Sequence, residues 1–317
     1  MSRMMFEIVA KFANTGFRRL LLTGVLIVFI GSSPTVWSGA DTEKEDGEAM
    51  MLETIGLGQN GKEQPPMFMD PDPQFTWREY ESPRENPIFK TGETLKYEVS
   101  WMGINAGTIT MTLSVDSEFE GSPAYKVVVV GETSKTFSLF FKVHDVITSY
   151  MEPGSFNSYH YIKDVREGDY RKLKETHYNQ VDHVATVQNE TYPLPPNSKD
   201  PIACIFAVRR YIPQPGKILR LNSNSEGKSN IPVEIDFSTR AKITLDGDIS
   251  RDVVMGKPLP TWEGRVFEKK QSKAIFWVTD DEYVVPLRLE TKVRIGSLKA
   301  ELIKREGPGW NLDLEED

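Results

Sequence analysis

A two-residue alternation of apolar and polar side chains, which begins after residue 92, limits the fold of this chain more than any other feature. Ile109, Met111 and Leu113 alternate with threonines, and a Gly-Ser-Pro turn at 121–123 leads into the apolar run YKVVVV. Successive side chains of a strand point to opposite faces of a sheet, so this pattern predicts a β-hairpin with one buried face.

The same alternation predicts further strands. They are expected near residues 142–151, 156–165, 170–179 and 181–188, with a turn at Glu167, Gly168 and Asp169. Towards the C-terminus, apolar residues from Val285 to Ile295 alternate with charged ones, and a Gly-Ser turn leads into LKAELIK. Strands at such short, regular spacing are typical of antiparallel β proteins.

One segment breaks the β pattern. Ser198 and Asp200 can cap a helix whose first residue is Pro201, and the run IACIFAVRR continues it to about Tyr211. Many short strands with one inserted α-helix, at about 199–211, predict a mainly β fold. We expect a curved antiparallel sheet or a partly open β-barrel.

Residues 1–40 have the order of a secretory signal peptide. Two arginines precede the apolar run LLLTGVLIVFI at 20–30, and the small residues Ser38 and Ala40 suit a signal peptidase. We predict cleavage after Ala40 and export to the periplasm or beyond. The alternative is a retained anchor helix, but the run covers only about half of the roughly 20 residues that cross a bilayer. No transmembrane anchor is therefore expected after cleavage.

The charge of the chain is unevenly distributed. Its net charge is −8, and the acids gather in residues 41–87, an expected disordered linker rich in Pro and Gly, and in an acidic tail at 311–317. The single β-rich domain expected at 88–310 holds 30 basic and 29 acidic residues. Such a domain lacks the basic stripe that binds phosphate backbones, so nucleic acid is not an expected partner.

Several candidate sites have simpler structural interpretations. Cys204, the sole cysteine, lies in an apolar helix and is expected to be buried rather than reactive. Asp280 and Asp281 could act as an acid–base pair, but adjacent aspartates also bond turn amides, and we favour a turn. The Asp-Gly-Asp at 246–248 lacks the remaining ligands of a calcium loop and predicts a hairpin turn. The G-x-G-x-x-G at 56–61 has no flanking strand or helix and predicts no dinucleotide site.

The four histidines could in principle bind a metal. They are His144, His160, His177 and His183, and none forms a recognised ligand pair such as H-x-x-x-H. Because they fall on different predicted strands, we predict no metal site. The sequence also contains no nucleophile elbow, phosphate loop or zinc-protease helix, so we expect no cofactor and no catalytic, cofactor-binding or metal residues, and no enzyme.

Three separated motifs resemble a known family. They are GETLKYEVSWMGINAGTITMTL at 92–113, SKDPIACIFAVRRY at 198–211 and IFWVTDDEYVVPLRLETKVRIGSLKAELI at 275–303. Together they resemble the bacterial envelope family called domain of unknown function 3108, over about residues 90–305, with a departure at 255–265. The resemblance implies an exported β protein; the family has no established activity.

These observations leave three hypotheses for function. The first is a non-enzymatic binding or carrier module of the cell envelope, with an apolar concave sheet face for a lipid, lipoprotein or glycolipid and the helix covering its mouth. The second is a structural or assembly partner of an envelope protein. The third is a hydrolase of an envelope polymer that uses carboxylates such as Asp280.

Overall fold

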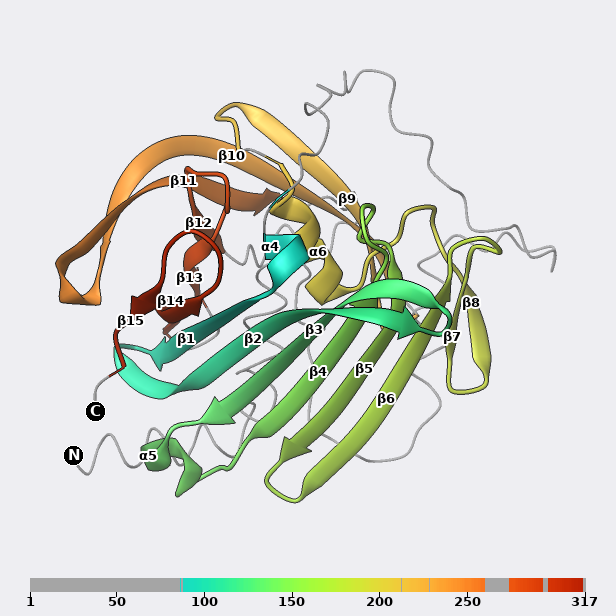
Figure 1. Ribbon diagram of the computed structural model, residues 1–317. Helices are drawn as coiled ribbons and strands as arrows, with labels where there is room; N and C mark the ends of the chain where they lie inside the picture. Colours follow the sequence, from blue (N-terminus) through green and yellow to red (C-terminus); the bar gives the residue numbers. More distant parts are fainter. Residues whose placement is uncertain are drawn as a thin grey trace, which may run out of the picture. The chain divides into compact units, whose positions relative to one another are not determined.

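The alternating residues after position 92 form a β-hairpin, β1 (Glu93–Trp101) and β2 (Ile104–Phe119), in a computed structural model (Figure 1). Met102 and Gly103 make its turn with φ of 51° and 80°, the left-handed conformation that suits a two-residue hairpin. The structure describes residues 86, 88–211, 213–227, 229–259, 274–292 and 296–315.

Short helices and long strands succeed one another along the described chain. The helical segments are α4 (Ile88–Thr91), α5 (Lys135–Ser138), α6 (Pro201–Val208) and the single turn η3 (Asp246–Asp248). The other strands are β3 (Ser122–Thr133), β4 (His144–Met151), β5 (Ser158–Glu167), β6 (Tyr170–Asn179), β7 (Val184–Val187), β8 (Glu190–Pro193), β9 (Lys217–Ser225), β10 (Ser229–Leu245), β11 (Ile249–Leu259), β12 (Ile275–Thr279), β13 (Pro286–Lys292), β14 (Ser297–Glu306) and β15 (Leu312–Asp313).

All named strands belong to one sheet of antiparallel pairs. Its order is β8-β7-β6-β5-β4-β3-β2-β1-β14-β13-β12-β11-β10-β9, and β15 pairs with β14. β1 lies between β2 and β14, so the first strand joins the two halves of the sheet. The end strands β8 and β9 do not pair with each other, so the sheet is open. The predicted fold class is therefore confirmed.

The predicted strand and helix positions agree with the structure in most places. β2 to β7, β13 and β14 lie where the alternation put them, and Asp200 caps α6 with Pro201 at its first position. The helix ends at Val208, three residues before the predicted end. The long strands β9, β10 and β11 were not predicted, and β15 lies in the segment expected to be an acidic tail. The predicted signal peptide lies outside the described residues, and so does the predicted linker at 41–87 apart from Asn86, which is buried.

Helix α6 is part of the core. All eight of its side chains are buried, and seven of them, Ile202 to Val208, belong to the same hydrophobic cluster as residues of the sheet such as Val127, Ile147 and Leu289. A helix that is apolar on all sides is one that packs on all sides. The structure places this helix in the packed core, and its expected role as a cover over the mouth of a ligand cavity stays a prediction. No helix among the described residues has the length and hydrophobicity needed to cross a bilayer.

A buried aspartate fixes the N-terminus of α6. Asp200 Oδ1 accepts hydrogen bonds from the amides of Ile202 and Ala203 at 2.8 and 3.0 Å. Its Oδ2 accepts from the hydroxyls of Ser149 and Ser158 at 2.7 and 2.6 Å. Burial raises the pKa of Asp200, and these four donors favour its carboxylate form. The helix is thereby attached to β4 and β5.

A buried ion triad fixes the other end of α6. Arg209, the residue after the helix, donates from Nη1 to Glu93 Oε2 at 2.6 Å, and Arg305 donates from Nε to Glu93 Oε1 at 2.8 Å. The side chains of all three residues are at most 1% exposed. Arg209 also donates from Nε to the carbonyl oxygen of Val284 at 3.1 Å. One carboxylate thus connects α6, β1 and β14.

Polar side chains connect the two ends of the open sheet. Glu226, in the turn between β9 and β10, forms ion pairs with Lys163 on β5 and Lys174 on β6 at 3.2 and 2.7 Å. Asn230 Nδ2 on β10 donates to the carbonyl oxygen of Pro193 at the end of β8 at 3.0 Å. These contacts join the β9–β10 end of the open sheet to β5, β6 and β8 through side chains.

We predict that Glu93→Gln lowers the free energy of unfolding by about 3–5 kcal/mol, because it leaves two buried guanidinium groups without a counter-charge. Urea unfolding at neutral pH measures this change. Glu98→Gln, a more exposed carboxylate on the same strand, is the matched control and should cost less than about 1 kcal/mol. Equal effects of the two substitutions would show that the triad adds nothing specific to stability.

We predict a second, pH-dependent contribution from Glu226. Burial raises its pKa, but Lys163 and Lys174 outweigh burial and lower the value from 4.5 to about 2. A carboxylate with a lowered folded-state pKa contributes stability above its unfolded pKa and loses it as the pH falls towards the folded value. The difference in urea stability between the native chain and Glu226→Gln should therefore be larger at pH 6 than at pH 3. A difference that does not change with pH would contradict this assignment.

Candidate functional site

The paired aspartates form a turn, as we favoured. Asp281 Oδ1 accepts from the amides of Tyr283 and Val284 at 2.9 and 3.1 Å, and its Oδ2 accepts from the indole of Trp310 at 3.2 Å. Asp280 pairs with Arg240. Both carboxylates therefore bond to neighbouring groups of the protein. The Asp-Gly-Asp at 246–248 forms the turn η3 between β10 and β11.

Cys204 is buried, as predicted. It is 2% exposed inside α6, and burial raises the pKa of its thiol to about 12. The thiol donates a long hydrogen bond to the carbonyl oxygen of Lys199 at 3.9 Å. A thiol in this environment is protonated at neutral pH and is a poor nucleophile.

The histidines divide into two kinds. His183 lies exposed in a turn with φ of 55°, and His144 pairs with Glu132 at 2.8 Å. His160 and His177, which the sequence placed on separate strands, lie opposite each other in the β5–β6 ladder. The signal for this pair was present, because a two-residue turn at Gly168 and Asp169 fixes the register of the whole hairpin.

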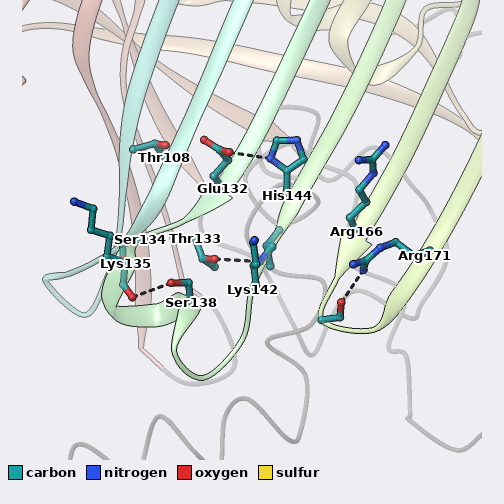
Figure 2. A pocket seen from close by; sticks show the side chains of 12 residues that line it. Thr108, Glu132, Thr133, Ser134, Lys135, Ser138, Lys142, His144, Arg166 and Arg171 are labelled. Atoms are coloured by element: carbon teal, nitrogen blue, oxygen red, sulfur yellow. Dashed lines mark hydrogen bonds and ion pairs between the residues drawn. The ribbon is translucent and has the colours of Figure 1, made fainter.

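A row of polar side chains crosses five strands on the sheet face opposite the core. Thr108 lies opposite Glu132 and Glu132 opposite His144, from β2 to β4. The register between β4 and β5 places His144 opposite Arg166, which in turn lies opposite Arg171 on β6. Figure 2 shows these side chains near the ends of their strands.

The loop around α5 forms the other side of this groove. Ser134 Oγ caps α5 by accepting from the amide of Phe137 at 3.3 Å, and the buried Phe137 ring anchors the loop in the core. Lys135 and Lys142 lie in this loop with exposed side chains that line the groove (Figure 2). The groove has a volume of ≈ 610 Å³.

The groove carries an excess of positive charge. Lys135, Lys142, Arg166 and Arg171 line it, and Glu132 is the sole carboxylate among its lining residues. Within the part of the chain that the structure describes, Lys135 and Lys142 form no ion pair, so their charges are not locally compensated. Cationic side chains that line a concave surface focus the potential and attract anions.

Two of these cations are held in place by the protein. Arg166 pairs with Asp164 at 2.6 Å, and this hydrogen bond raises the pKa of the guanidinium. Arg171 donates from Nη1 to the carbonyl oxygens of Gly168 and Tyr170 at 2.7 and 2.8 Å. The arginines therefore form a fixed edge of the groove, whereas the lysines are free to reach a ligand.

The two serine hydroxyls in the groove donate to backbone carbonyl oxygens. Ser134 Oγ donates to the carbonyl oxygen of Asn105 at 3.0 Å, and Ser138 Oγ donates to that of Lys135 at 2.8 Å. His144 faces Glu132. A nucleophilic mechanism needs a hydroxyl bonded to its base, whereas these two of the groove's four hydroxyl side chains donate to carbonyl oxygens.

These features define an open-sheet, mainly β protein with a cationic groove on its outer face. The chain belongs to the family described as "Protein of unknown function (DUF3108)", whose model matches residues 96–303. The predicted family is therefore confirmed. The motif glycine Gly107 shows one physical reason for the pattern, because an added Cβ would lie 2.0 Å from the carbonyl oxygen of Glu132 on β3.

The chain is also similar to a solved structure titled as a beta-barrel-like protein of domain of unknown function DUF1849 from Brucella abortus. The TM-score is 0.49 at 7% sequence identity, and the match covers 69% of this chain and 98% of that chain. No curated protein matches the chain.

We predict that Cys204 does not react with a thiol reagent in the folded protein at pH 8, because its raised pKa leaves almost no thiolate and burial blocks access. Ellman's reagent with and without guanidinium chloride measures this, and one thiol should appear on unfolding. Reaction of the folded protein at the rate of free cysteine would show that the helix opens readily.

Proposed function

We propose that this protein is an exported, non-enzymatic binding module of the bacterial cell envelope, and that its groove binds the anionic headgroup of a lipid or glycolipid. The observation that carries the proposal is the excess of cations in the groove, with Lys135 and Lys142 exposed and uncompensated. Phosphates and carboxylates are the anionic groups of such amphiphiles. The basic, apolar and small-residue order of residues 1–40 supports the export part of the proposal.

The geometry favours the headgroup over the acyl chains as the recognised part. Helix α6 fills the inner side of the sheet with buried apolar side chains, so the apolar face is used in the protein's own core. The groove lies on the other face and is lined by charged and hydroxyl side chains. Arginines fixed at its edge can bind a phosphate or carboxylate with two parallel hydrogen bonds, and the lysines add mobile charge.

Vesicle sedimentation tests this proposal. The chain from residue 41 onward is mixed at low salt with vesicles of phosphatidylcholine alone or with added phosphatidylglycerol. We expect binding to the anionic vesicles and weak binding to the neutral ones. Lys135→Gln with Lys142→Gln should weaken anionic binding roughly 30-fold, since each lysine near an anionic surface contributes about 1 kcal/mol.

The control variant loses the same number of lysine charges at positions outside the groove. Lys242→Gln with Lys292→Gln removes two exposed lysines from β10 and β13, away from the groove, and should leave binding nearly unchanged. Equal losses in both double variants would mean that net charge alone governs binding. Equal binding to neutral and anionic vesicles would remove the headgroup from the proposal.

A further inference from the structure

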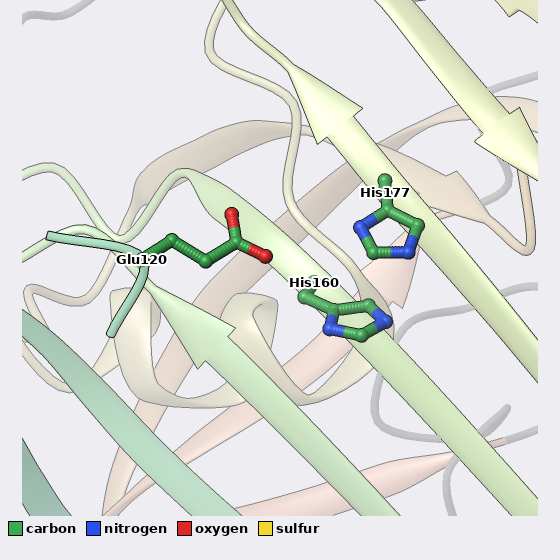
Figure 3. A group of neighbouring side chains, drawn as sticks. All are labelled: Glu120, His160 and His177. Carbon is green, nitrogen blue, oxygen red and sulfur yellow. The ribbon is translucent and has the colours of Figure 1, made fainter.

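A second group of polar side chains lies on the same outer face, at the other end of the strands. His160 on β5 and His177 on β6 lie opposite each other, with ring centroids 3.9 Å apart and planes inclined by 20°. Glu120, from the turn between β2 and β3, extends towards them (Figure 3). One ligand atom from each of the three side chains lies within 4.8 Å of the others.

His160 is buried and incompletely bonded. Its exposed fraction is 9%, and its Nε2 atom has no hydrogen-bond partner in the part of the chain that is described. Glu175 Oε2 lies 3.4 Å from this atom, which is an ion-pair distance, but the geometry does not make a hydrogen bond. The long contact with Glu175 leaves this buried nitrogen weakly satisfied, so it is available to a further ligand.

We propose that Glu120, His160 and His177 bind one divalent transition-metal ion of the zinc class. Two imidazole nitrogens and a carboxylate oxygen form a typical donor set for zinc, which takes four ligands and is often completed by water. Magnesium and calcium prefer oxygen ligands and are poor fits. Glu175 lies close enough to His160 to serve as the fourth ligand or to orient the ring.

Metal binding requires a small rearrangement. In stacked imidazole rings the nitrogen lone pairs point in nearly parallel directions. A tetrahedral zinc ion instead needs ligand atoms about 3.3 Å apart, with their lone pairs directed at the ion. His160 is fixed by burial, but His177 and Glu120 are exposed and can rotate. The ion would then join the β2–β3 turn to β5 and β6. Neither β5 nor β6 is adjacent to β2 or β3 in the sheet.

Isothermal titration of the full mature chain, purified without a histidine tag, with zinc chloride tests the proposal. We expect one zinc ion per chain and no saturable binding of magnesium. His177→Ala and Glu120→Gln should each weaken zinc binding by at least about tenfold, the loss typical for groups that support a metal site. Both residues are exposed, so neither substitution should unfold the protein.

Exposed histidines outside the cluster provide the controls. His183→Ala and His144→Ala should leave zinc affinity and stoichiometry unchanged, since neither residue lies in the cluster. Absence of saturable zinc binding would overturn the proposal. Equal losses in His177→Ala and His183→Ala would also overturn it, because they would indicate unspecific surface binding.

Discussion

The fold depends on how one short helix is held inside an open sheet. A buried carboxylate fixes each end of α6: Asp200 attaches its start to β4 and β5, and Glu93 binds Arg209 at its end. Through Arg305, Glu93 also joins the first strand of the domain to β14. Buried ion pairs can be replaced by apolar groups without loss, so their contribution is the uniqueness of the arrangement more than net stability. Removing one partner, however, leaves a buried charge unpaired.

The position of α6 in the core bears on where a ligand can bind. Helix α6 packs against the inward face, and the cationic groove lies on the outer side of β2 to β6. That face carries the cationic groove near one end of the strands and the histidine pair near the other. In β5, Arg166 and His160 are six residues apart and therefore point to the same side. A single surface of the sheet thus carries both the proposed anion site and the proposed metal site.

Sequence patterns predicted the parts of this structure that follow local rules. Alternation located β2 to β7, and the capping aspartate before a proline located α6. Strands β9 to β11 were missed although β10 follows the same rule, since its buried Val233, Ile235 and Phe237 alternate with polar residues. The groove and the histidine pair were missed because each depends on register across several strands. The turn predicted at 167–169 fixes the pairing register of β5 and β6, and this register sets His160 opposite His177.

Hydrogen exchange at α6 tests the central claim most directly. If the two buried carboxylates hold the helix as part of the core, its amides should exchange only when the whole sheet unfolds, with the same opening free energy as β1 and β14. If α6 were a lid over a ligand cavity, its amides would exchange through local opening while those of β1 remained protected. Exchange of α6 at a clearly lower opening free energy than β1 would contradict the account.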